Sequence, residues 1–229
     1  MEKHITHTKA LSRFLQLLDG SFPSGAFVHS FGLEPHIVLK KVSSVDELKV
    51  FLKNLIIDQY VGFDFVFVKK VYKYFQEGKL SLIQKEEKNF HAMLVYEYAK
   101  ASVNIGRNYL KQIDFEIQNS VVKDYFTGVK EKKYIGNELC ILSAYAVELG
   151  MDLELFLLLW CKKNIINIAM TSLKISRIKP SEIQQILFEF DDCLEKYIQV
   201  SEKKINNFNP LFEEIIYQHE HLQPKMFTT

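Results

Sequence analysis

The chain has 229 residues, of which 48% are hydrophobic and 25% are charged, with a formal net charge of +1. This is the composition of a globular protein that can bury a sizeable core, and the near-neutral charge argues against a protein that recruits nucleic acid by bulk attraction. Five prolines and nine glycines are too few for a sandwich of many short strands. We expect an all-α, single-domain bundle of roughly eight to ten helices over residues 1–229.

The cysteine pattern and the apolar runs indicate the cellular location of the protein. Cys140, Cys161 and Cys193 are far apart and show no paired spacing, and the N-terminus has no signal-like pattern. Both features favour a reducing, cytoplasmic environment in which the thiols belong to the core. The densest apolar run, Leu155–Cys161, is too short to cross a membrane. We therefore expect neither a membrane nor a nucleic acid as a partner.

The N-terminal residues 1–9 are polar and are expected to form a flexible segment. His4 and His7 have a spacing that places them on one helix face, where they could bind a metal, or they belong to a loose tail. After them, apolar residues recur at helical spacing and stop at Asp19-Gly20. These residues are Leu11, Phe14, Leu15 and Leu18.

The stretch Phe22–Glu34 reads FPSGAFVHSFGLE and mixes turn residues, apolar residues and polar residues. Its glycines reach backbone conformations that other residues resist, and its proline fixes φ. We predict a half-buried loop that runs into a helix beginning near Ser30; a tight interhelical corner without a further role is the alternative. Glu34 should face a hydrogen-bond donor or a cation, because an unpaired buried carboxylate is costly.

Further along, the sequence predicts a short helix over Phe31–Lys41 and then a helix behind a capping box, in which Glu47 follows Ser44 by three residues. Val61–Phe75 fits both a strand and a helix, and its length favours the helix. Glu86–Ile113 is predicted to be one long helix with Glu97 beside its apolar stripe.

The second half of the chain is also helical in pattern. A helix over Leu139–Leu149 should close at Gly150, and Asp152 should cap a helix over Leu153–Ile175. Pro180 begins a final amphipathic helix. A polar linker follows it, and residues 201–229 are expected to form a partner-binding C-terminal tail.

The N-terminal segment Leu15–Glu34, LQLLDGSFPSGAFVHSFGLE, resembles the signature of the urease accessory protein UreF family. The residues that match this signature, in order and without gaps, are Pro23, Gly25, Ala26, Phe27, His29, Ser30, Gly32, Leu33 and Glu34.

The resemblance continues with partial motifs along nearly the whole chain. In the middle motif Glu97, Gly106 and Arg107 match, but Ala99 stands where the family has an arginine. Lys174 matches a later position. In the tail the matching residues are His219, Glu220 and Phe227, with Lys225 in place of an arginine.

The resemblance implies a non-enzymatic scaffold for urease maturation, without a cofactor. UreF proteins are all-α homodimers that bridge a UreD-type protein (UreH in some species) and the GTPase UreG, so that nickel is installed in apo-urease. The partner-binding residues that the resemblance implies are Pro23, Gly25, Phe27, His29, Ser30, Gly32, Glu34, Glu97, Lys174, His219, Glu220, Lys225 and Phe227. The 18 phenylalanines and 11 tyrosines also favour a homodimer, because aromatic residues are enriched at interfaces.

Two alternatives remain open. The first is a nickel-binding metallochaperone that uses His4, His7, His219 and His221, which predicts direct metal affinity. The second is a hydrolase with an unrecognised site, which predicts turnover without any partner. The sequence contains no GxxxxGK[ST], GxSxG, HExxH or GxGxxG motif. A triad assembled from His29, Ser30 and Glu34 lacks the spacing of a nucleophile elbow, and local hydrogen bonding explains these residues better.

Overall fold

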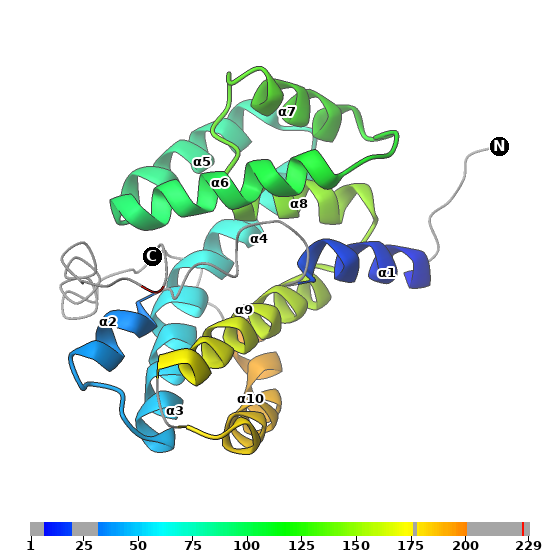
Figure 1. The fold of residues 1–229 in the computed structure, drawn as a ribbon. Helices are drawn as coiled ribbons and strands as arrows, with labels where there is room; N and C mark the ends of the chain where they lie inside the picture. Colours follow the sequence, from blue (N-terminus) through cyan, green and yellow to red (C-terminus); the bar gives the residue numbers. More distant parts are fainter. Residues whose placement is uncertain (1–6, 20–31, 176–177, 201–225, 227–229) are drawn as a thin grey trace. The chain divides into compact units, whose positions relative to one another are not determined.

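The computed structural model describes residues 7–19, 32–175, 178–200 and 226. In these residues the chain forms ten α-helices and one π-helix and no strand, so the predicted all-α class is confirmed (Figure 1). The helices are α1 (His7–Leu18), α2 (Leu33–Val38), α3 (Val45–Asn54), the π-helix η2 (Leu55–Asp64), α4 (Phe65–Gln76), α5 (Leu80–Met93), α6 (Tyr96–Gln112), α7 (Ser120–Lys130), α8 (Glu138–Glu148), α9 (Leu153–Ile175) and α10 (Pro180–Val200).

Local signals place several helix ends as predicted. The Ser44 hydroxyl accepts a hydrogen bond from the Glu47 amide while the Glu47 carboxylate accepts from the Ser44 amide, which is the predicted capping box. Asp152 accepts from the Leu155 amide at 2.9 Å and begins α9. Gly150 has a φ of 62° after α8, a conformation that glycine adopts without strain.

Two predicted helices have different limits in the structure. The helix expected from Ser30 or Phe31 to Lys41 is only Leu33–Val38, because Gly32 takes a left-handed conformation and Lys40 also has a positive φ. The long helix predicted over Glu86–Ile113 is wrong. It is divided into α5 and α6 by Leu94 and Val95, whose backbones are extended (ψ 144° and 140°).

This break explains the exposure of the residues around it. Met93 and Tyr96 are 48% and 70% exposed, so the apolar stripe predicted for one long helix does not run through the junction. Phe90 in α5 stacks on Phe67 at 4.0 Å between ring centroids, whereas α6 packs along α8. No glycine or proline marks the junction, which is why the sequence pattern concealed it.

The π-helix clarifies the ambiguous pattern around Val61–Phe75. This segment is helical, as predicted, but η2 has the wider π geometry up to Asp64. Phe63, Phe65 and Phe67, which alternate in the sequence as in a strand, are all buried. The alternation therefore reflects burial on several sides of the helix and not a strand.

No helix is predicted for residues 114–138, but α7 lies there. Asn119 caps it by accepting hydrogen bonds from the amides of Val121 and Val122 at 3.1 Å. Its buried residues Val122, Tyr125, Phe126 and Val129 keep helical spacing. Both signals, the Asn119 cap and the helical spacing, are readable in the sequence alone.

The chain divides into two compact units, and the prediction of one domain over residues 1–229 stays a prediction. The first unit comprises Met1–Ala26 and Phe67–Leu159. Its centre is α6 against α8, and α7 packs on both helices (Figure 1). The ring of Phe75 lies edge-on to Tyr125, at 5.3 Å between centroids.

The second unit comprises Phe27–Val66 and Trp160–Thr229. Here α10 packs on η2 and α3, and Lys49 of α3 forms an ion pair with Glu189 of α10. Trp160 fills the interior against Tyr60, at 4.9 Å between ring centroids. This unit contains Glu34, which is central to the candidate site.

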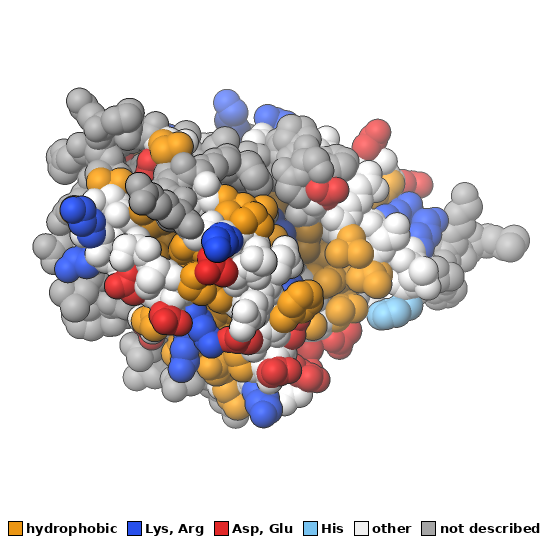
Figure 2. Space-filling model, turned by 60° about the horizontal axis from the view of Figure 1, so that its bottom comes forward, with side chains coloured by type: hydrophobic (Ala, Val, Ile, Leu, Met, Phe, Trp, Pro, Cys, Tyr) orange, Lys and Arg blue, Asp and Glu red, His pale blue; other side chains and the backbone are white. Residues whose placement is uncertain are grey.

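The described surface carries charges of both signs. On the face in Figure 2, Lys and Arg side chains are interspersed with Asp and Glu side chains. This face therefore has no field of one sign that would attract a polyanion. In the described part of the chain no helix has the length and apolar character needed to span a bilayer.

Candidate partner-binding site

The candidate site begins at the corner that precedes α2. Gly32 is the N-cap of α2 and has φ 84° and ψ −5°, a left-handed conformation that suits glycine. The Nδ1–H of His36 donates to the Gly32 carbonyl oxygen at 2.6 Å. Burial lowers the pKa of His36. The ring is therefore neutral at neutral pH, and its hydrogen bond to Gly32 stabilises this corner. The positive φ explains why a glycine suits position 32.

We predict that Gly32→Val lowers the free energy of unfolding by about 1 kcal/mol or more, because a β-branched residue resists a positive φ. The measurement is chemical denaturation of the purified full chain. Gly32→Asn is the matched control, since asparagine enters the left-handed region more readily than valine. Equal stability of the Val variant and the wild type would contradict the prediction.

Glu34 is the best-defined residue of the site. It is 1% exposed, and its Oε1 accepts a hydrogen bond from the backbone amide of Met226 at 2.7 Å. The expectation that Glu34 faces a donor is confirmed. The two residues are 192 positions apart in the chain, so this bond ties the N-terminal motif to the C-terminal tail. A bond between a buried carboxylate and an amide is among the stronger protein hydrogen bonds.

Several residues predicted for partner binding lie outside the described residues: Pro23, Gly25, Phe27, His29, Ser30, His219, Glu220, Lys225 and Phe227. Lys174 lies in α9, but its side chain is also outside them. Met226 is the described residue between Lys225 and Phe227, and it is 55% exposed. The structure thus brings Glu34 and Met226 together, and the remaining assignments stay predictions.

The middle motif belongs to the first unit. Glu97 lies half-buried in the first turn of α6, where a carboxylate is favoured by the helix dipole. Ala99, at the position where UreF proteins carry an arginine, is buried. Gly106 faces the backbone before α8 so closely that an added Cβ would lie 2.4 Å from the Gly136 oxygen. Gly106 is therefore needed for the packing of α6 on α8.

The first unit contains a buried carboxylate, Glu87, that is not predicted from the sequence. Glu87 of α5 is 1% exposed, and its Oε1 accepts from the Tyr125 hydroxyl at 2.6 Å, the Gly136 amide at 3.0 Å and the Asn137 amide at 2.8 Å. Burial raises its pKa against the lowering effect of these bonds. The signal was present, because Glu87 stands between Ile83 and Phe90 on the buried face of α5. Its role is structural, since its contacts are all internal.

The described residues provide little for catalysis. Burial raises the pKa of the Cys140 and Cys161 thiols, so neither is a thiolate at neutral pH. Among the described residues no group of three or more His, Cys, Asp or Glu side chains could hold a metal ion. Of the four histidines proposed for nickel, only His7 is described, and it is exposed. The other three, His4, His219 and His221, lie outside the described residues, so the structure does not test the metallochaperone alternative.

Comparison with known proteins identifies the family. The UreF family model matches residues 42–191. The chain therefore belongs to the UreF family, whose curated members are named urease accessory protein UreF.

Three curated relatives show how far the similarity extends. The chain is 24% identical over 224 residues to urease accessory protein UreF of Bacillus sp. (strain TB-90), covering 96% of this chain and 98% of the relative. It is 23% identical over 196 residues to UreF of Ureaplasma urealyticum serovar 10, covering 82% and 83%. It is 22% identical over 140 residues to UreF of Corynebacterium glutamicum (strain R), covering 61% of each.

Proposed function

We propose that this protein is a non-enzymatic scaffold of urease maturation. It bridges a UreD-type (UreH-type) accessory protein and a UreG-type GTPase, and the complex installs nickel in apo-urease in the cytoplasm. Nickel is the cargo of this process and needs no resident site in the scaffold. The family membership supports the accessory role, and the scaffold acts as a homodimer in this proposal.

The main structural support for this proposal is one hydrogen bond. The bond between Glu34 and the Met226 amide joins two segments that both match UreF motifs. A hydrogen bond from an amide to a buried carboxylate is strong, so it restrains the backbone of Met226 at Glu34. We infer that the corner of Gly32 and Glu34 and the tail at Met226 belong to one partner-binding surface.

The test removes this bond in the full-length chain. We expect Glu34→Ala to weaken capture of purified UreD-type and UreG-type proteins about tenfold or more, because a hydrogen bond to a charged group contributes ~1.5–3 kcal/mol. Glu34→Gln keeps an oxygen acceptor for the Met226 amide and should retain most of the capture. The measurement is quantitative co-purification, with urease activity in cells as the second readout.

A matched control is Glu195→Ala, which removes an exposed carboxylate of α10 in the same unit. This variant should capture both partners as the wild type does. Circular dichroism reports whether each variant remains folded. A folded Glu34→Ala protein that captures both partners and activates urease at the wild-type level would refute the proposed surface.

A further inference from the structure

A cavity of about 220 Å³ opens in the first unit, where α1 and α6 end. Its walls come from α1, from α6 and the residues after it, and from α8. The lining residues are Arg13, Gln16, Leu17, Gln112, Ile113, Asp114, Phe115 and Tyr145. A water molecule takes up ~30 Å³ in the liquid, so this space holds about seven waters or one small organic molecule.

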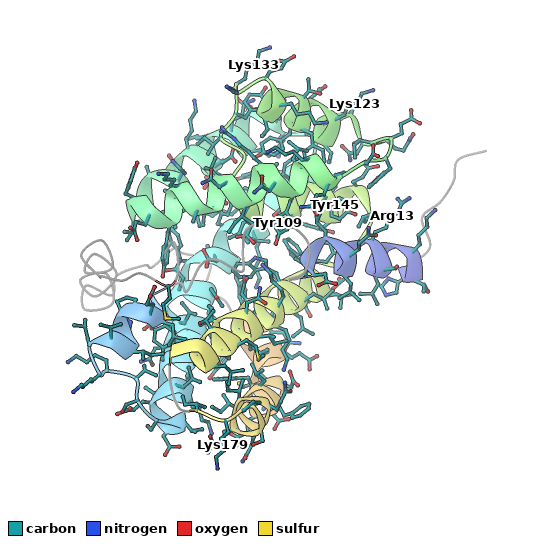
Figure 3. The ribbon with its side chains drawn as sticks, in the orientation of Figure 1. Arg13, Tyr109, Lys123, Lys133, Tyr145 and Lys179 are labelled. Carbon is teal, nitrogen blue, oxygen red and sulfur yellow. The ribbon has the colours of Figure 1, made fainter. Side chains whose placement is uncertain are left out.

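Arg13 supplies the positive charge of the cavity. Its guanidinium carbon lies 4.3 Å from the centre of the Phe115 ring, in a cation–π contact. The Tyr145 hydroxyl donates to the Arg13 carbonyl oxygen at 3.4 Å, and Figure 3 shows these two residues next to each other. The guanidinium N–H groups are directed outward along its edge, in the plane of the group. That edge is suited to a carboxylate in bidentate geometry.

Asp114 supplies the negative charge and is exposed. Although both residues line the same cavity, no ion pair in the described residues joins Arg13 or Asp114 to each other or to another group. The cavity therefore presents one positive and one negative side chain that do not pair with each other. A ligand that carries one charge of each sign would complement both.

Gln112 adds an uncharged polar group. Its Oε1 is buried and has no hydrogen-bond partner in the described protein. Leaving a buried polar atom without a partner is costly, and a bound molecule with N–H or O–H groups would remove that cost. The carboxamide can serve either end of such a molecule, because its oxygen accepts and its nitrogen donates.

We propose that this cavity is a binding site for a small zwitterion, a free α-amino acid with a short side chain. The ligand's carboxylate binds the Arg13 guanidinium, its ammonium group binds Asp114, and the Gln112 carboxamide bonds one of the two. A peptide terminus carries only one of these charges and matches the site less well. The bound amino acid would connect α1 to the end of α6. This inference is independent of the proposed role in urease maturation.

Isothermal titration calorimetry of the full chain tests the proposal with glycine, acetate and methylammonium as probes. We expect glycine to bind about tenfold or more tightly than either single-charge probe, since it alone satisfies both residues. Arg13→Lys should weaken glycine binding about tenfold, because lysine lacks the bidentate fork. Asp114→Asn should weaken glycine binding to a similar degree and leave acetate binding unchanged.

The control is Glu116→Gln, an exposed carboxylate two residues from Asp114 that does not line the cavity. It should bind glycine as the wild type does. Asp114→Asn alters an exposed side chain, so it remains informative even if Arg13→Lys disturbs the packing on Phe115. Equal binding of glycine and acetate, unchanged glycine binding in Asp114→Asn, or no glycine binding to the wild type at tens of millimolar concentration would each overturn the proposal.

Discussion

Replacing Gly106 by alanine is expected to lower the free energy of unfolding by about 3 kcal/mol, the upper part of the range for overpacked cores. The added Cβ would lie 2.4 Å from the Gly136 oxygen, 2.8 Å from the Glu138 nitrogen and 2.9 Å from the Asn137 carbonyl carbon. All three are backbone atoms, which cannot move aside as a side chain can. Either α6 separates from α8 or the segment before α8 shifts. The midpoint of thermal unfolding should fall by about 6–12 °C.

Gly150→Ala is the matched control for this prediction. Gly150 has a φ of 62° but no atom within 4 Å of an added Cβ. Its replacement should therefore cost only the conformational strain, about 1 kcal/mol. If the Gly106→Ala variant is no less stable than the Gly150→Ala variant, the prediction is wrong. The space between α6 and the backbone before α8 would then accommodate a side chain at position 106.

The second large effect is expected at Glu87. Glu87→Ala should destabilise the protein by about 3 kcal/mol or more, because it leaves three buried donors without their acceptor. These donors are the Tyr125 hydroxyl and the amides of Gly136 and Asn137. They come from α7 and from the segment before α8, so the loss should loosen α5 from both. Urea denaturation monitored by circular dichroism measures the change.

Glu87→Gln separates the hydrogen bonds from the charge. Glutamine keeps an oxygen acceptor and should retain most of the stability. Burial raises the pKa of Glu87 above its ordinary value of 4.5, so the folded state holds this proton more tightly than the unfolded state. The contribution of Glu87 is thus full below pH 4.5 and is lost as the pH rises through the folded-state pKa.

The pH dependence gives this prediction its sharpest test. Over the range from pH 4.5 to neutrality, the wild type should lose stability relative to Glu87→Gln, whose side chain stays neutral. Stability curves for the two proteins that run parallel over this range would contradict a raised pKa. They would show that the three donors hold Glu87 as a carboxylate throughout.

Much of the helical fold and its family was readable from the sequence. The capping box at Ser44, the cap at Asp152 and the stop at Gly150 lie within four residues of the backbone groups they control. Such interactions need only neighbouring atoms, so a local pattern is enough to recognise them. The motif that ends at Glu34 likewise identified the family without any coordinates.

Only the tertiary structure decided where helices break and which polar groups meet. The extended backbone at Leu94 and Val95 lets α5 and α6 follow different neighbours, although no local breaker marks the site. The donors to Glu87 lie 38, 49 and 50 residues away, and the donor to Glu34 lies 192 residues away. A helical pattern shows which face of α5 is buried, but the partner of a buried carboxylate depends on which distant segment the packing brings to it.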